Sequence, residues 1–451
     1  MGNTTQDSRT DTKRLLEIIK IISKYKVAQG FSPEKMCEMF SELGPTYVKL
    51  GQLLSMHPEV IPIEYCRKLE SLRSDASHLV TAQIRDIISE EYGRPWTSVF
   101  QRIMPFPLGA ASIAQVHEAI LLDGTRVAVK IQRPDIYDTM ERDVRLLKKA
   151  FSIVKIKDLN DVVDLSNTLD EMWSVAQEEM DFLREADNIR LLRKNSEGIQ
   201  YVYCPKVYDE LCTKNVLVME YIDGFQMNDL ETMRKNGYDL HEVCTKFINS
   251  YIKQFAEDRF FHADPHPGNV FVSGGQIVWL DLGMMGKLSE KDAELVKECM
   301  KAIVTNDYVA FADAMLDICE HDPNIDMDAY YERLRLYLDK YRVISMEEMS
   351  STVDIFADLY RIARDFRIQV PTTYTMFWRS LSIMEGTVTD LAPDTDLAAI
   401  IGKHLAAQNM IGGIAGSITK SISHKKLISG KPLSYNGHEQ EPDDVIDETE
   451  E

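Results

Sequence analysis

The sequence has no long hydrophobic run, no paired cysteines and no excess of basic residues, and each absence excludes a class of protein. No stretch approaches the roughly 18–20 apolar residues that cross a bilayer, and the start, MGNTTQDSRTDTKR, is too polar for a secretory signal. The 7 cysteines are scattered without a CxxC pair, which argues against a disulfide framework or a zinc site. The formal charge of −21 argues against general nucleic-acid binding. We therefore expect a cytoplasmic protein with no membrane span and no nucleic-acid partner.

The order of sequence patterns predicts an α+β protein in four regions. Residues 1–100 have apolar positions at helical spacing, and residues 101–224 hold alternating strand patterns interrupted by a helical segment. Residues 225–410 are mostly helical, with one strand–turn–strand pattern in NVFVSGGQIVWL. Residues 411–451 form a basic and then strongly acidic tail, which we expect to be disordered.

The run HADPHPGN (262–269) admits three interpretations: a metal site, a catalytic loop or a polar turn. His262, Asp264 and His266 alternate, so on a strand they would face one side, as metal ligands must. Two prolines in the run argue against a regular strand, and no nearby histidine or cysteine cluster completes a four-ligand shell. A rigid loop is therefore the better reading.

The spacing of three polar residues favours the catalytic loop. Protein kinases carry a catalytic aspartate, an asparagine five residues later, a hairpin, and then an aspartate followed by x-Gly. Asp264, Asn269 and Asp281 follow this order, with the hairpin between the last two. We predict that Asn269 and Asp281 hold Mg²⁺ against the phosphates of ATP, while Asp264 orients or deprotonates the nucleophile. Either piece alone would suggest only a polar loop and a surface turn.

Further upstream, the strand pattern VAVK supplies a candidate for phosphate binding. Ala128 and Lys130 share one face of the strand, which suits a lysine that grips phosphates while the alanine lies beneath the adenine. Glu185, at the edge of an apolar helical stripe, is predicted to pair with Lys130 as a further catalytic residue. The long separation of the two implies an inserted helical element. The strand VLVMEYIDG, with Glu220, resembles the hinge between two kinase lobes, where a nucleotide binds.

Two expected kinase elements are missing. The phosphate loop G-x-G-x-x-G is replaced by PLGAASIAQVHEA, so Ala110, Ala111 and Ser112 are the candidate phosphate-loop residues. No A-P-E element follows Asp281, so the platform for a protein substrate is not visible.

Six segments together resemble the UbiB/AarF (ADCK-type) atypical kinase family over roughly residues 35–400: YVKLGQLLSMHPEVIP, PLGAASIAQVHEA, VAVKIQRPDI, EMDFLREADN, HADPHPGN and LDLGMMG. The resemblance implies a protein-kinase-like fold with a small β-rich N-lobe, a helical C-lobe and an N-terminal helical extension in the space of a peptide substrate. It also implies binding of ATP and Mg²⁺, ATPase or phosphotransfer activity, and support of isoprenoid-quinone or other lipid metabolism.

The chain departs from this family in places. Met56-His57 stands where Thr-Arg is common, and Gly109 stands for an alanine. The hydrophobic spanning helices that often end bacterial relatives are absent, which weighs against an integral membrane anchor and a direct link to quinones.

The Lys-x-Gly-Gln segment is read in two ways. Lys49 and Gln52 lie three positions apart and share a helix face, as in any amphipathic helix with a solvated lysine. The family resemblance instead places this face over the nucleotide phosphates, next to Glu179 and Asp181, where Lys49 would pair with one of these acids and keep the extension closed.

The basic helix KRLLEIIKIISKYK leaves a second choice open. Its apolar face would suit either an anionic membrane surface or packing against other helices of the chain. Isoprenoid lipids are partners that the family resemblance implies. The sequence does not define an oligomeric state.

Overall fold

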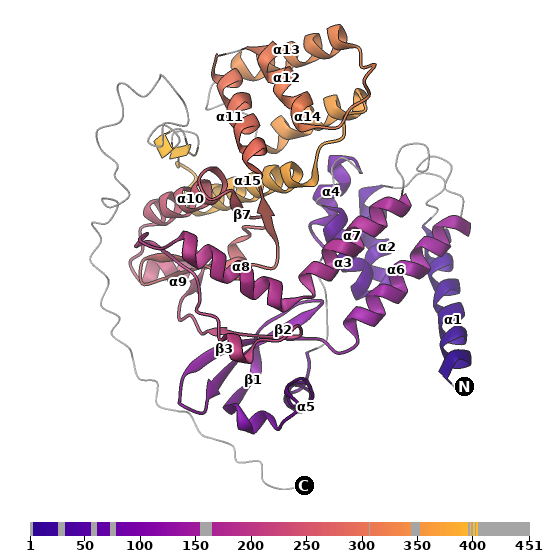
Figure 1. Cartoon of the computed structure of the whole chain (residues 1–451), viewed down its shortest axis with the longest axis vertical. Helices are drawn as coiled ribbons and strands as arrows, with labels where there is room; N and C mark the ends of the chain where they lie inside the picture. Colours follow the sequence, from indigo (N-terminus) through magenta and orange to yellow (C-terminus); the bar gives the residue numbers. More distant parts are fainter. Residues whose placement is uncertain are drawn as a thin grey trace.

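The fold, shown in Figure 1, has a small sheet lobe, a larger helical lobe and a group of helices beside them. This computed structural model describes residues 3–25, 32–55, 61–72, 78–153, 165–305, 307–343, 352–395, 397, 400–401 and 403–404. The tail 411–451 and Met56-His57 lie outside the described residues. The expected α+β, two-lobed architecture is confirmed.

The N-lobe is an antiparallel sheet in the order β1-β2-β3-β5. The strands are Phe100–Ala110 (β1), Ala114–Leu121 (β2), Arg126–Gln132 (β3) and Val216–Glu220 (β5). Strand β1 begins one residue before the strand-rich region predicted from residue 101. It carries two prolines and irregular register, which an edge strand tolerates because it needs fewer ladder hydrogen bonds. Helix α5 (Thr81–Tyr92) packs its buried Ile84 and Ile88 against this sheet.

Within the described residues, helices α6 (Ile136–Ile153) and α7 (Leu165–Glu179) lie between β3 and α8 (Phe182–Asn195), which accounts for the long separation of Lys130 and Glu185 in the sequence. Helices α6 and α7 lie beside the extension, whose helices are α1 (Asn3–Lys24), α2 (Pro33–Leu43), α3 (Pro45–Leu54) and α4 (Ile63–Leu69). The extension and the inserted helices α6 and α7 therefore form one helical group.

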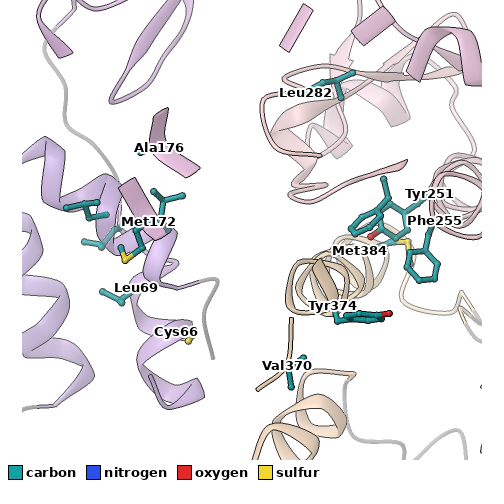
Figure 2. Packing of buried hydrophobic residues seen from close by; sticks show 14 of the residues in the cluster. Cys66, Leu69, Met172, Ala176, Tyr251, Phe255, Leu282, Val370, Tyr374 and Met384 are labelled. Atoms are coloured by element: carbon teal, nitrogen blue, oxygen red, sulfur yellow. The ribbon is translucent and has the colours of Figure 1, made fainter. Parts of the chain in front are cut away.

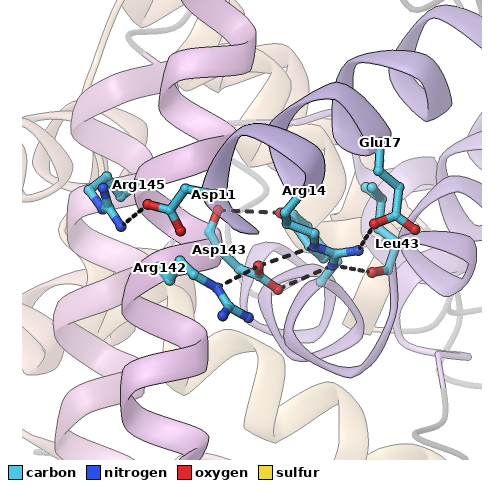
Figure 3. A network of polar contacts seen from close by, with 8 residues as sticks. Asp11, Arg14, Glu17, Leu43, Arg142, Asp143 and Arg145 are labelled. Atoms are coloured by element: carbon cyan, nitrogen blue, oxygen red, sulfur yellow. Dashed lines mark hydrogen bonds and ion pairs between the residues drawn. The ribbon is translucent and has the colours of Figure 1, made fainter. Parts of the chain in front are cut away.

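Helix α1 is held in this group by an apolar face and by the polar contacts of Arg14. Ile18 and Ile22 are fully buried, and Arg14 reaches Asp143 of α6 at 3.2 Å and the Leu43 carbonyl at 2.7 Å (Figure 3). The apolar face of the basic helix is thus used for packing inside the molecule, which was one of the two alternatives. No helix within the described ranges has the length and apolar character of a membrane span.

The C-lobe is built on α10 (Leu240–Ala256) and α15 (Thr372–Leu391). Figure 2 shows Tyr251 and Phe255 of α10 beside Met384 of α15, and, in a separate part of the core, Leu69 of α4 near Met172 of α7. The remaining helices are α9 (Leu230–Lys235), α11 (Glu290–Thr305), α12 (Tyr308–Ile318), α13 (Met327–Val343) and α14 (Thr352–Asp365).

Two small sheets pack against α10 and α15 of the C-lobe. The predicted hairpin is β8 (Val270–Ser273) and β9 (Gln276–Trp279), flanked by the two-residue strands β6 (Phe225–Gln226) and β4 (Val202–Tyr203). The second sheet pairs β7 (Phe260–His262) with β10 (Met285–Lys287), a pairing that the sequence did not indicate. It fixes both ends of the segment that carries Asp264, Asn269 and Asp281.

Candidate functional site

Lys130 lies at the centre of a buried charge cluster. Its ammonium donates to both carboxylate oxygens of Glu185 at 3.0 and 2.9 Å and to Oδ1 of Asp281 at 3.1 Å. The side chains of Lys130 and Glu185 are 11% and 2% exposed. Strand β3 supplies the lysine and helix α8 the glutamate, so the predicted pair of Lys130 and Glu185 is confirmed.

The charges of this cluster depend on one another. The Lys130 ammonium holds the pKa of Asp281 below its ordinary value. Burial raises the pKa of Glu185 to about 7, against the opposing effect of Lys130. Although burial alone would lower the pKa of Lys130, Asp281 and Glu185 raise it, so the lysine stays charged. Lys130 is therefore the fixed cation of the site.

The segment from His262 to Asn269 is a closed loop and not a metal cage. The Asn269 side-chain NH₂ donates to the Asp264 carbonyl at 3.2 Å, and the Asp264 backbone NH donates to Nδ1 of His262 at 3.1 Å. His266 accepts from the Gly268 backbone NH at 3.2 Å. No group of three metal-ligating side chains is found in the part of the chain that the structure describes. These contacts make the segment a rigid loop, as the two prolines predicted, and they hold the Asp264 backbone in place.

Asn269 and Asp281 stand at adjacent ends of the β8–β9 hairpin. The Leu280 backbone NH donates to the Asn269 carbonyl at 2.9 Å, and Asp281 follows with φ of 49°, a left-handed conformation that is strained for aspartate. The Asp281 side chain is 53% exposed. One carboxylate and one amide oxygen suit Mg²⁺, which commonly takes one or two protein oxygens and completes its shell with phosphate and water. The residues present therefore fit a nucleotide-bound magnesium ion.

The extension reaches the same cluster through Lys49 of α3. Lys49 forms an ion pair with Oε2 of Glu179, at the end of α7, and the two side chains are 15% and 7% exposed. The predicted pairing of Lys49 with an acid of this segment is confirmed. Beside the larger effects of burial and of Lys130, Glu179 raises the pKa of Glu185 and Lys49 lowers the pKa of Asp281, so the extension pair acts on the charges around Lys130.

The two other polar residues of these motifs have structural partners. The Gln52 side chain donates to the Leu72 carbonyl at 2.9 Å, within the extension. Asp181 is the N-cap of α8 and accepts from the Leu183 backbone NH at 3.2 Å. A Cβ at Gly51 would lie 2.5 Å from Leu72, so the glycine permits a close helix contact.

The candidate nucleotide-binding residues of the N-lobe lie in different surroundings. Ala110 and Ala111 are exposed in the β1–β2 turn, where the Arg133 side chain donates to the Ala111 carbonyl at 3.0 Å. Ser112 is buried, as is Ala128 on β3. At the hinge, the Glu220 carboxylate accepts from the Tyr203 hydroxyl at 2.7 Å and the Lys206 backbone NH at 3.0 Å.

Arg379 is a site residue that sequence reasoning missed. Its Nη2 lies 3.7 Å from Oδ1 of Asp264, and its Nε lies 3.7 Å from Oε1 of Glu70, at the end of α4. Arg379 stands inside MFWRSLSIMEG, which reads as helical core, and no spacing rule connects it to residue 264. A lone arginine in an apolar helical stripe was the one available signal.

Comparisons with known proteins point to one family. A family model of the ABC1 atypical kinase-like domain matches residues 71–315, and one of the UbiB helical domain matches residues 334–396. A Clostridium pasteurianum protein, named for its place in the 5′ region of hydrogenase 1, is 32% identical, with the alignment covering 88% of this chain and 76% of that protein. A probable protein kinase UbiB from Sodalis glossinidius is 29% identical, with the alignment covering 82% of this chain and 69% of that protein.

A solved structure shares the fold. It is the complex of Rv3197 with erythromycin from Mycobacterium tuberculosis, with a TM-score of 0.51, 20% identity, and coverage of 76% of this chain and 87% of that one. With the family match over residues 71–315, the chain belongs to the UbiB/ABC1 family of atypical kinase-like proteins.

Proposed function

We propose that the protein is an Mg²⁺- and ATP-dependent phosphotransferase or ATPase. The observation that carries this proposal is the position of Lys130 between Glu185 and Asp281, with Asp281 half exposed beside Asn269. Phosphoryl transfer needs mainly positioned phosphates and neutralised charge, and this cluster supplies both.

Each residue has a defined task in this proposal. Lys130, held by Glu185, binds the phosphates of ATP, and Asn269 and Asp281 hold Mg²⁺, which would neutralise charge on the phosphate oxygens. Asp264 orients the acceptor hydroxyl or water and accepts its proton. Its backbone is fixed from both sides, by His262 and by Asn269. The turn Ala110–Ser112 would cover the phosphates, with Ala128 beneath the adenine and the hinge at Glu220 beside it.

The extension acts as a cover in this proposal. The pair of Lys49 and Glu179 joins α3 to α7 next to the charge cluster, with Gln52 and Asp181 stabilising the two segments. Such a cover leaves no room for a polypeptide acceptor. Support of isoprenoid-quinone or other lipid metabolism at a membrane surface remains a prediction from the family resemblance.

A second candidate function is a nucleotide-gated module that binds a lipid or a protein and turns over little ATP. The exposed Ala110 and Ala111 favour it, because their methyl groups keep the backbone further from phosphates than glycine would. ATP hydrolysis by the wild type, tested with and without lipid vesicles, separates the two candidates. Binding without any hydrolysis would favour the module.

The test is thermal stabilisation by MgATP together with turnover. We expect millimolar MgATP to raise the unfolding midpoint of the wild type, Asp281→Asn to lose this magnesium-dependent shift, and Asp264→Asn to keep the shift but lose hydrolysis. Asp390→Asn, an exposed acid on α15, is the matched control and should behave as wild type. An unchanged shift in Asp281→Asn would reject the assignment.

A further inference from the structure

A cavity of about 210 Å³ lies between the extension and the C-lobe, and one of its lining residues, Arg379, approaches the proposed catalytic aspartate. Its walls come from α4 and the residue after it (Cys66 and Glu70), from α14 (Phe356) and from α15 (Trp378, Arg379 and Ser382). It therefore exists because the extension is docked on the C-lobe. We call it the α4–α15 cavity.

Arg379 connects this cavity to Asp264. The arginine lines the cavity, and its Nη2 lies 3.7 Å from the Asp264 carboxylate, beyond hydrogen-bond distance. Its Nη1 atom is buried and has no hydrogen-bond partner among the described residues, whereas its Nε lies 3.7 Å from the Glu70 carboxylate. A buried donor on a charged group is costly when unpaired, so Nη1 favours a ligand that brings an oxygen acceptor.

The walls define the rest of the ligand. Phe356 and Trp378 stack on each other with ring centroids 5.0 Å apart, and they offer an apolar surface to a ring or short carbon skeleton. Charges of both signs line the cavity, with Glu70 against Arg67 and Arg379. Asp264, outside the lining, adds a further negative charge beside Arg379, and this balance favours a neutral ligand. A cavity of about 150 Å³ can hold benzene. The space therefore suits a single ring with one or two substituents.

We propose that the α4–α15 cavity is the acceptor site and that it binds a small neutral hydroxyl compound. The hydroxyl oxygen accepts from Arg379, and its hydrogen points to Asp264. This inference rests on the proposed function. In the transfer, the hydroxyl proton passes to Asp264 and the hydroxyl oxygen bonds to the γ-phosphorus of ATP. The bond from that phosphorus to the β–γ bridging oxygen breaks, which releases ADP and a phosphate monoester.

The experiment uses benzyl alcohol as the probe and measures its affinity for the full chain by ligand-observed NMR. Ser382→Leu fills the cavity and should weaken binding at least tenfold, whereas Thr389→Leu, an exposed change on the same helix, should leave it unchanged. Asp264→Ala should weaken binding about tenfold, because the hydroxyl loses a charged hydrogen-bond partner. If Ser382→Leu does not fold, Ser382→Val replaces it with a smaller expected loss.

Stabilisation by MgATP is measured on the same variants, to separate this inference from the proposed function. Ser382→Leu should keep the full MgATP shift. Absence of benzyl alcohol binding to the wild type, or equal binding to Ser382→Leu or to Asp264→Ala, overturns the acceptor site while the MgATP shift stands. Binding that depends on Ser382, without any MgATP shift in the wild type, overturns the proposed function and with it the acceptor role.

Discussion

Two lysines from different parts of the molecule belong to the same charge cluster, and their surroundings differ. Lys130, in the kinase-like core, meets both oxygens of Glu185 and one of Asp281. Lys49, in the extension, meets one oxygen of Glu179, whose Oε1 is buried without a hydrogen-bond partner among the described residues. The core pair is complete, and the extension pair is not. The extension pair should therefore be the easier of the two to break.

The largest effect is expected from Lys130→Met, which leaves Glu185 buried without its cation. Breaking a buried pair costs about 3–5 kcal/mol, and we expect the lower end because Glu185, with its raised pKa, then takes up a proton. Denaturant unfolding measures the loss. Arg126 lies on the same strand as Lys130 and forms an exposed pair with Glu118. Arg126→Met should therefore cost less than about 1 kcal/mol. Equal losses in the two variants would contradict the central position of Lys130.

The next effect is expected from Lys49→Met. The pair with Glu179 is more exposed than the core pair and uses one carboxylate oxygen, so we expect a loss of roughly 2 kcal/mol. The variant should also change nucleotide affinity several-fold and expose self-phosphorylation, because the extension is loosened. Lys24→Met removes an exposed pair on α1 and is the control. If Lys49→Met matches this control in nucleotide affinity and in self-phosphorylation, the extension has a purely structural role.

Two glycines within helices test the packing of the extension. A Cβ at Gly51 would lie 2.5 Å from Leu72 and 3.3 Å from Phe40, whereas a Cβ at Gly386 of α15 meets nothing within 4 Å. Gly51→Ala should cost about 1–2 kcal/mol because overpacking exceeds the gain in helix propensity. Gly386→Ala should stabilise by about 0.5–1 kcal/mol. Stabilisation of similar size in both would show that α3 is not packed closely in solution.

The smallest effect concerns pH and the N-lobe. His117 of β2 has its ring between the Met104 carbonyl at 2.9 Å and the Gln115 side-chain nitrogen at 2.8 Å, and burial lowers its pKa below the ordinary 6.5. The unfolded chain then binds the proton more readily, so stability is lost as pH falls from about 7 to 5. The wild type should lose more unfolding free energy over this window than His117→Gln. Parallel pH curves for the two proteins would contradict this.

Local patterns predicted much of the site because its residues are close in sequence or repeat at strand and helix periods. Asp264 and Asn269 share one short loop, the β8–β9 hairpin joins Asn269 to Asp281, and the alternation of β3 identified the face of Lys130. The partner of Lys130 also followed, since Glu185 borders the apolar stripe of α8.

Contacts between distant helices could not be predicted in this way. Arg379 approaches Asp264 only because α15 packs against α10 and the β7–β10 sheet, and the amphipathic pattern of α15 does not specify that neighbour. The partner of Gln52 could not be predicted either. The sequence indicated which face of α3 carries Gln52, but it did not indicate that the segment with the Leu72 carbonyl packs against that face.

The most direct test of the account is electron paramagnetic resonance of Mn²⁺, as a substitute for Mg²⁺, bound with a non-hydrolysable ATP analogue. The account predicts one tight, nucleotide-dependent Mn²⁺ site in the wild type, its loss in Asp281→Asn and its retention in Asp264→Asn. Tight Mn²⁺ binding that survives Asp281→Asn, or that needs no nucleotide, would contradict the assignment of the metal and the phosphates to this cluster.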